Sequence, residues 1–245
     1  MKRITAAWLS LCAAGQVAAA DITVSAAASL NNAFREAAAA YEVAHPGHKV
    51  LLNFGASDAL VAQIAKGAPV DVFASADQEA MDKAQAHVAP GTRRDFASNR
   101  LVVAVPAASS LQWRTLADLG QPGVQRLATG NPASVPAGRY ARSALEKAGQ
   151  WQALEPKFVF ATNVRQALDY IARGEVEAGL VYQTDVASQA GKVRAVLAVP
   201  TATPITYPLA VLKEAPNAAG ARGFAEFILS ASGQAILARH GFGKQ

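Results

Sequence analysis

Short apolar segments alternate with helical segments along almost the whole chain, and this alternation constrains the fold more than any other feature. Residues 22–25, 49–54 and 70–74 are rich in β-branched or aromatic side chains, as strands are. Between them lie stretches at 31–45 and 59–67 whose apolar residues recur at helical spacing. Strands separated by helices favour a mostly parallel sheet with helices on its faces, so the pattern predicts an α/β fold.

The same layout recurs in the second half of the chain, which predicts two lobes rather than one long sheet. Further strands are expected at 126–129, 157–161 and 178–182, again separated by helical segments. Extended segments near 98–105 and 203–212 would join the two lobes.

The boundaries of the lobes are therefore placed inside these joining segments. We expect residues 21–100 plus 207–245 to form one lobe and residues 101–206 to form the other. Pro208 cannot donate to a sheet ladder, so its strand is predicted at a sheet edge or in the crossover. Ligands of open α/β sheets bind outside the carboxyl ends of the strands, which places the predicted site in a cleft between the lobes.

Residues 1–20 have the order of features that is typical of a cleaved signal peptide. Lys2 and Arg3 precede an apolar run, and small residues at 17–20 predict cleavage before Asp21. The apolar run is shorter than the ~20 residues that span a membrane. Export to the periplasm is the expected consequence.

The only cysteine of the chain, Cys12, lies inside this predicted signal. A lipid-attachment role is disfavoured because Leu11 precedes it where a small residue is needed. We therefore interpret Cys12 as part of the signal, which leaves the exported protein without a disulfide or a thiol nucleophile.

The charge balance argues against nucleic acid as a partner. The chain has 23 Lys and Arg against 18 Asp and Glu, and loss of Lys2 and Arg3 would reduce its net charge from +5 to +3. In the remainder only Arg93 and Arg94 are adjacent, and no basic stripe contains interleaved aromatic residues.

The residues for most enzyme and metal chemistries are missing from the sequence. It has no nucleophile-elbow, P-loop or dinucleotide-binding motif. His45 and His48 flank a Pro-Gly turn without further ligands nearby, so no metal-cation site is predicted. An exported serine hydrolase using Ser29 or Ser57 is a remote alternative, because Asp58 is the only acid beside either serine and no histidine is near.

The turns after the strands instead supply neutral hydrogen-bond donors at helix starts. Free N–H groups in the first turn of a helix bind anions. Neutral donors suit a fully ionised oxyanion, because they bring no counter-ion that must itself be desolvated. The alternative for Ser29 is that it only caps its helix. The candidate anion-binding residues are Ser29, Ser57, Ala137, Val164 and Tyr182.

Two further acids have structural interpretations. Asp71 lies within an apolar strand and is expected to accept backbone N–H groups, because a buried carboxylate needs such partners. Asp77 is expected to cap the helix that follows it.

Taken together, these stretches resemble the periplasmic molybdate-binding proteins of ABC transporters, a branch of the two-lobed solute-binding proteins. The resemblance covers essentially all of the chain after residue 20. The matching stretches are AAASL at 26–30, FGAS at 54–57, GAPVDVFASAD at 67–77, VPAGRYA at 135–141, NVRQAL at 163–168 and GLVY at 179–182.

The resemblance implies a periplasmic-binding-protein fold and a binding protein without enzymatic activity or cofactor. Its ligand would be molybdate, and tungstate as well, held by the hydroxyls of Ser29, Ser57 and Tyr182. Backbone amides of Ser29, Ser57, Ala137 and Val164 would complete the set. The expected partner is an inner-membrane ABC permease, and the protein is expected to be a monomer.

Three residues qualify this interpretation. Asp58 stands where the family usually has Gly or Ser, and it could repel a dianion or accept the proton of hydrogen phosphate. Sulfate or phosphate is therefore the alternative ligand, although the simpler expectation is that Asp58 points away and favours its helix start by charge. Arg165 is expected to form a structural ion pair outside the pocket. His240 stands where the family commonly has Tyr, and no functional consequence is expected.

Overall fold

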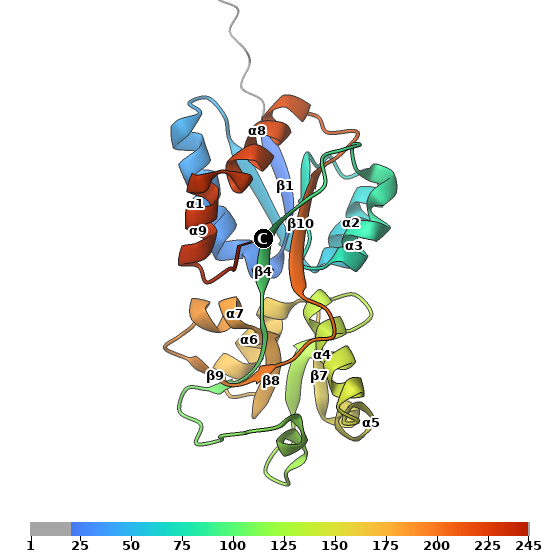
Figure 1. Ribbon diagram of the computed structural model, residues 1–245, viewed down its shortest axis with the longest axis vertical. Helices are drawn as coiled ribbons and strands as arrows, with labels where there is room; N and C mark the ends of the chain where they lie inside the picture. Colours follow the sequence, from blue (N-terminus) through green and yellow to red (C-terminus); the bar gives the residue numbers. More distant parts are fainter. Residues whose placement is uncertain (1–20, 245) are drawn as a thin grey trace, which may run out of the picture.

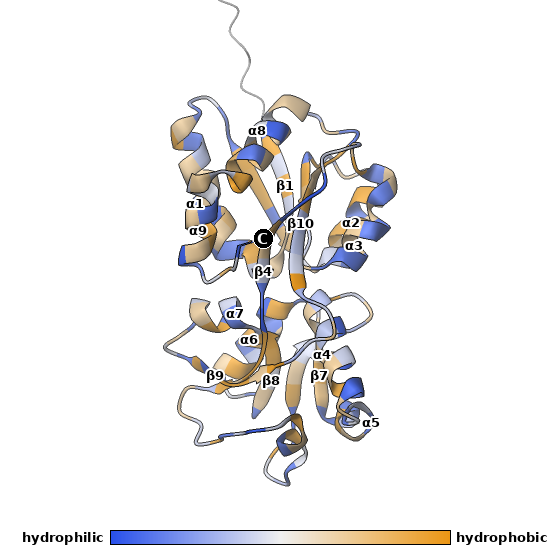
Figure 2. Ribbon diagram, viewed as in Figure 1, coloured by the Kyte–Doolittle hydropathy of each residue, from blue (hydrophilic) through white to orange (hydrophobic). Residues whose placement is uncertain are grey.

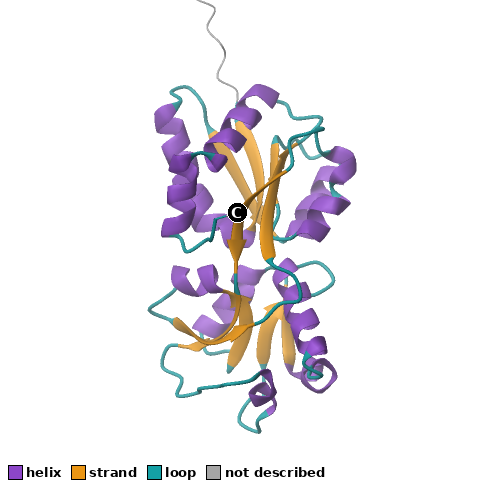
Figure 3. Ribbon diagram, viewed as in Figure 1, coloured by secondary structure: helices purple, strands orange, loops and turns teal. Residues whose placement is uncertain are grey.

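The computed structural model describes residues 21–244, which form two lobes that each contain a five-stranded sheet (Figure 1). Helices lie on the faces of both sheets (Figure 3), so the predicted α/β architecture is confirmed. The predicted signal peptide, with Cys12, lies outside the described residues. Within residues 21–244, no helix is long and apolar enough to cross a membrane.

The first lobe is built from both ends of the described chain. Its strands are β1 (Ile22–Ala27), β2 (Val50–Gly55), β3 (Val72–Ala74), β4 (Arg94–Asn99) and β10 (Ile205–Val211). Its helices are the 3₁₀ turn η1 (Ala28–Leu30), α1 (Asn31–Ala44), α2 (Ser57–Ala65), α3 (Gln78–Lys83), η2 (Gln85–His87), α8 (Ala218–Leu229) and α9 (Ala231–Arg239).

The second lobe is built from the middle of the chain. Its strands are β5 (Leu101–Pro106), β6 (Leu127–Gly130), β7 (Phe158–Ala161), β8 (Ala178–Tyr182) and β9 (Val193–Val199). Its helices are η3 (Leu116–Gly120), α4 (Pro136–Lys147), α5 (Trp151–Leu154), η4 (Glu155–Lys157), α6 (Val164–Ala172) and α7 (Gln183–Ser188).

Both sheets are mixed, with a single reversed strand among the five described in each. The first has the order β2-β1-β3-β10-β4, in which β10 runs antiparallel to both neighbours. The second has the order β7-β6-β8-β5-β9, in which β5 is reversed. In each lobe, the reversed strand is the first strand in sequence after the chain crosses from the other lobe. The two crossings therefore account for the departure from a purely parallel sheet.

The structure corrects one expected strand. The run 99–105 was expected as a single strand, but it contains a break at Arg100 between β4 and β5. β4 itself was not predicted, because its sequence RDFASN is mostly polar and places only Phe96 and Ala97 in the core. The chain crosses between the lobes at this break.

Of the two placements expected for Pro208, the sheet edge was wrong, whereas its strand does follow directly on a crossing between the lobes. β10 is the neighbour of both β3 and β4 and is therefore an interior strand. The strand tolerates proline because its pairing with β4 shifts register between Tyr207 and Pro208, and a bulge needs no ladder N–H there. The carbonyl of Pro208 still accepts the N–H of Ser75, at 2.9 Å.

The core of the first lobe combines small and aromatic side chains. Figure 2 shows the apolar residues concentrated on the strands, with hydrophilic residues mostly on the helices and loops. Ala33 and Ala37 bury one face of α1, which lets this helix lie close to its sheet. Between them, Phe34 meets Phe96 and Phe224 at ring-centroid distances of 5.7 and 6.1 Å, a favourable tilted or edge-on geometry.

Asp71 ties three elements of this lobe together, as the sequence predicted. Its carboxylate is buried and accepts the N–H of Thr23 at 2.8 Å and the N–H of Asn217 at 2.6 Å. It therefore links the start of β3 to β1 and to the turn that begins α8.

We expect Asp71→Ala to destabilise the first lobe by about 2–5 kcal/mol, because two buried N–H groups would lose a charged acceptor. The measurement is the urea concentration at which half of the protein, residues 21–245, is unfolded. Asp82→Ala is the control, since the Asp82 side chain is 65% exposed and pairs only with Arg93. Equal midpoints for the two variants would contradict the prediction.

Candidate functional site

A small cavity lies between the two lobes, and all five candidate residues line it. Its volume is about 10 Å³, so it has no room for an organic ligand. The lining residues come from the ends of β1, β2 and β8 and from the starts of α2, α4 and α6: Ala27, Ala28, Ser29, Gly55, Ala56, Ser57, Ala76, Val135, Pro136, Ala137, Asn163, Val164 and Tyr182.

No charged side chain belongs to this lining. Three α-helices begin at it: α2 at Ser57, α4 at Pro136 and α6 at Val164. Because the first N–H groups of a helix have no partner within the helix, these starts give the cavity a positive character without a cation.

Close backbone packing fixes the start of α4. Gly138 faces the end of β6, and a methyl group at this position would overlap the carbonyl oxygen of Gly130. Pro136 occupies the first turn, where its missing N–H removes no helical hydrogen bond. Ala137, between these two residues, therefore has a closely defined backbone position.

Ser57 has a hydroxyl proton available for the cavity. Its Oγ accepts the N–H of Ala76 at 3.1 Å, and this bond leaves the Ser57 proton free to donate elsewhere. The Ser57 side chain is fully buried, so the cavity is the natural direction for that donation.

Tyr182 carries the clearest sign of a missing ligand. Its phenol oxygen is buried, and among residues 21–244 it has no hydrogen-bond partner. Burial raises the pKa of the Tyr182 phenol well above its ordinary value, so the group stays protonated and can donate. Buried hydroxyls normally have partners, and this one therefore indicates an acceptor that occupies the cavity.

Ser29 is a buried hydroxyl rather than a helix cap. It lies inside η1, and no side-chain cap bond starts that turn. Its Oγ lies 3.1 Å from the phenol oxygen of Tyr207, which in turn receives a hydrogen bond from Asn99. Sequence reasoning missed Tyr207 and Asn99, although their positions in the two joining segments place them where the lobes meet.

The charged residues close to the cavity point away from it and toward one another. Asp58, the unusual residue beside Ser57, pairs with Lys83 at 2.6 Å and with Arg139 of the second lobe at 2.7 Å. Arg139 also pairs with Asp77 at 2.7 Å. The expectation that Asp58 points away is confirmed, and its ion pair across the lobes is an addition.

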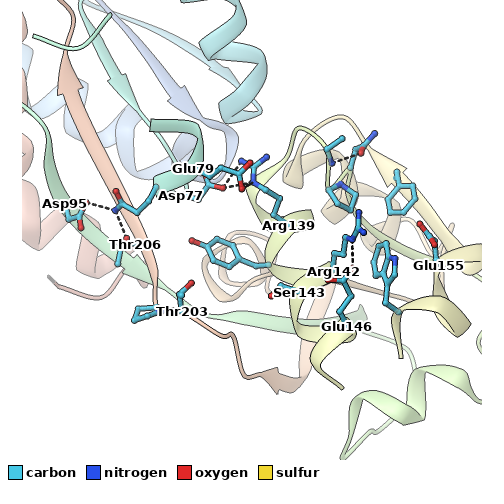
Figure 4. Close-up of a pocket in the computed structure, with 18 residues that line it drawn as sticks. Asp77, Glu79, Asp95, Arg139, Arg142, Ser143, Glu146, Glu155, Thr203 and Thr206 are labelled. Carbon is cyan, nitrogen blue, oxygen red and sulfur yellow. Dashed lines mark hydrogen bonds and ion pairs between the residues drawn. The ribbon is translucent and has the colours of Figure 1, made fainter. Parts of the chain in front are cut away.

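Asp77 has two roles among these charged residues. It caps α3 as predicted, accepting the N–H of Ala80 at 3.0 Å, and it also anchors Arg139. Figure 4 shows these groups at the edge of an open cleft of about 820 Å³. That cleft is much larger than the cavity, but its two arginines already pair with acids of the chain, Arg139 with Asp58 and Asp77 and Arg142 with Glu146. We therefore place the candidate site at the cavity.

Arg165 forms a second bridge on another side of the cavity. Its guanidinium forms an ion pair with buried Asp185 at 2.9 Å, as expected, outside the lining. It also donates to the side chain of Asn32 and to the carbonyl of Ser29, at 2.9 and 3.1 Å, both in the first lobe. Arg139 and Arg165 therefore hold the two lobes together in a closed arrangement.

Residues 21–244 contain no group of three or more His, Cys, Asp or Glu side chains that could hold a metal ion. His45 stacks on Tyr41 at a centroid distance of 4.1 Å, and its Nδ1 lies 3.0 Å from the carbonyl oxygen of the same residue. His240 lies 2.7 Å from the carboxylate of Glu36, outside the cavity lining.

Comparison with known proteins gives matches along the whole described chain. The model of the family described as bacterial extracellular solute-binding protein matches residues 22–243. The molybdate-binding protein ModA of Escherichia coli strain K12 is 38% identical over 248 residues, which cover 96% of this chain and 94% of that protein.

Two solved structures have the same fold. The periplasmic molybdate-binding protein of Azotobacter vinelandii has a TM-score of 0.82 at 26% identity and covers 91% of this chain and 99% of its own. The sulfate-binding protein SubI of Mycobacterium tuberculosis has a TM-score of 0.78 at 22% identity, with coverage of 91% and 86%, and supports the fold alone.

The Asp185 carboxyl gives the site a pH-dependent stability. Burial raises its pKa from 3.8 to about 6, against the opposing effect of Arg165. The folded protein therefore holds this proton more tightly than the unfolded chain, and the associated stability is present below about pH 4 and lost as pH rises through about 6.

Asp185→Asn should remove this contribution. We expect the difference in unfolding free energy, wild type minus variant, to decrease as the pH rises from 4 to 7. Urea titrations at several pH values measure it. Asp82→Asn controls for titration at an exposed site. A constant difference across that range would contradict the assignment.

Proposed function

The chain belongs to the family of bacterial extracellular solute-binding proteins, and we propose that it binds molybdate and delivers it to an ABC transporter. The observation that carries the proposal is the small cavity lined by neutral donors, with the phenol of Tyr182 at its wall and without a partner among residues 21–244. Similarity to ModA of Escherichia coli over almost the entire chain supports molybdate as the ligand.

The binding energy would come from hydrogen bonds to a charged group. The proposed donors are the hydroxyls of Ser29, Ser57 and Tyr182 and the amides of Ser29, Ser57, Ala137 and Val164. Each such bond contributes about 1.5–3 kcal/mol, so the set supplies on the order of 10 kcal/mol. After the losses on association, that is sufficient for micromolar or tighter binding.

The cavity favours some oxyanions over others. Hydrogen phosphate carries a proton that needs an acceptor, but no carboxylate lines the cavity, and Asp58 already pairs with Lys83 and Arg139. Sulfate has the charge and shape of molybdate but is smaller, so discrimination against it would come from the spacing of the donors. Tungstate matches molybdate closely and should bind as well.

A serine hydrolase is disfavoured by the same geometry. No histidine lines the cavity, and the only acid beside Ser57 is neutralised by two cations. The proposed role is therefore binding without catalysis and without a cofactor.

Delivery would depend on opening and closing of the lobes. The expected boundaries were residues 21–100 plus 207–245 and 101–206; because β10 begins at Ile205 in the sheet of the first lobe, we place the second boundary at that residue. The hinge would lie in the two segments where the chain crosses. The protein would be exported by its predicted signal peptide and act in the periplasm as a monomer, presenting its ligand to an inner-membrane permease.

Calorimetric titration of residues 21–245 with molybdate, tungstate, sulfate and phosphate tests the proposal. Tight one-to-one binding of molybdate and tungstate, with no heat from sulfate or phosphate, is the expected result. Preferential binding of phosphate or sulfate would overturn the proposed ligand, and hydrolysis of a generic ester that is lost in Ser29→Ala would overturn the proposed class.

Ser29→Ala should weaken molybdate binding by about 10- to 150-fold, the loss of one hydrogen bond to a charged group. The matched control is Ser25→Ala. It also removes a buried hydroxyl, but Ser25 lies in β1, accepts a hydrogen bond from Asn53 and does not line the cavity. Unchanged affinity in Ser29→Ala would remove this hydroxyl from the site.

Arg139→Met should weaken molybdate binding by about 5- to 30-fold, although Arg139 does not line the cavity. The reason is that its pairs with Asp58 and Asp77 form only when the lobes close. Arg142→Met, on the same helix, is the control because Arg142 pairs with Glu146 of its own helix. Equal affinities for the two variants would show that the ion pairs do not stabilise closure.

A further inference from the structure

A chain of side-chain hydrogen bonds leads from the hinge to the cavity. Ser29 lies at the cavity wall, and its Oγ is 3.1 Å from the phenol oxygen of Tyr207 on β10. Tyr207 is 3.1 Å from the amide nitrogen of Asn99, the last residue of β4. That nitrogen also lies 2.8 Å from Oγ1 of Thr184, in α7 of the second lobe.

The direction of each bond in this chain follows from the chemistry of Asn99. The amide nitrogen has two protons and cannot accept, so it donates to both Thr184 and Tyr207. The amide oxygen accepts the N–H of Arg100 at 2.9 Å, which fixes the orientation of the group. The phenol oxygen of Tyr207 therefore accepts from Asn99. Its own proton also needs an acceptor, and Oγ of Ser29, at 3.1 Å, is in position to be that acceptor.

This arrangement makes the Ser29 proton available to the cavity. When its Oγ accepts from Tyr207, the Ser29 proton is free to donate to a ligand in the pocket that Ser29 lines. Tyr207 is fully buried, and burial raises the pKa of its phenol, so the phenol keeps the proton on which this arrangement depends.

We propose that Tyr207 and Asn99 are positioning residues that set the Ser29 hydroxyl as a hydrogen-bond donor to the bound oxyanion. Neither residue lines the cavity, and both act through Ser29. The inference rests on the proposed binding of an oxyanion at this cavity.

Two consequences follow from the position of these hydrogen bonds. With one lone pair of Ser29 occupied by Tyr207, the Ser29 proton is available to a ligand, which favours a fully deprotonated oxyanion at this position. Because Asn99 also bonds to Thr184 of the second lobe, the orientation of Ser29 is completed only when that lobe is in place.

A double-mutant cycle tests the proposal. Molybdate affinity is measured by calorimetry for the wild type, Ser29→Ala, Tyr207→Phe and the double variant. We expect Tyr207→Phe alone to weaken binding by about 5-fold or more, as removal of one hydrogen bond in a buried network does. In the Ser29→Ala background the same change should have no further effect, because Tyr207 acts through Ser29.

A purely structural role of Tyr207 would give a different result. It would weaken binding by the same factor in both backgrounds, and such additivity, or an unchanged affinity in Tyr207→Phe, would overturn the proposal. Tyr41→Phe, at a buried tyrosine of the same lobe that packs against Phe224, is the control and should leave affinity unchanged.

Asn99→Leu provides a second measurement if Tyr207→Phe does not fold. It removes the donor to Tyr207 and should weaken binding only when Ser29 is present; equal losses in both backgrounds would overturn the proposal. A wild type that binds none of molybdate, tungstate, sulfate and phosphate would overturn the proposed function together with this inference. A wild type that binds, with additive losses, would overturn the inference alone.

Discussion

A buried anion can be held without a cation if the groups around it present enough hydrogen-bond donors whose protons have no better acceptor in the protein. The cavity between the lobes meets this condition in different ways. Ser57 accepts the N–H of Ala76, and Ser29 lies within reach of the Tyr207 phenol. The helix starts supply N–H groups that have no acceptor within their own helices. Most features of the fold serve to bring these donors to one point.

The placement of charge follows from the same condition. Arginines inside the cavity would attract any anion, including ones of the wrong size, whereas the observed arginines lie around it and bind acids of the chain. Arg139 bonds to Asp58 and Asp77 across the lobes, and Arg165 bonds to Asp185 and to the carbonyl of Ser29. The charges therefore stabilise the closed arrangement, while neutral groups contact the ligand space.

The sequence predicted the parts of this protein that depend on local pattern. The alternation of strands and helices apart from β4, the cap at Asp77 and the buried acceptor Asp71 all follow from spacing and from the needs of single side chains. Of the two alternatives for Pro208, the sheet edge failed because a register shift, which has no local signature, lets an interior strand accept proline. Tyr207 and the bond between Asp58 and Arg139 were missed because they pair residues 178 and 81 positions from their partners.

The starts of α2, α4 and α6 have a consequence for how such a site can change over generations. A contact made by a backbone amide belongs to the chain rather than to a side chain, so replacing Ala137 or Val164 by any residue except proline deletes no donor. Gly138 adds to this resistance, since the close approach of α4 to Gly130 leaves little freedom to shift the helix. New ligand preferences would therefore arise first at the hydroxyl positions, and the amide framework would be inherited nearly unchanged by descendants that bind other anions.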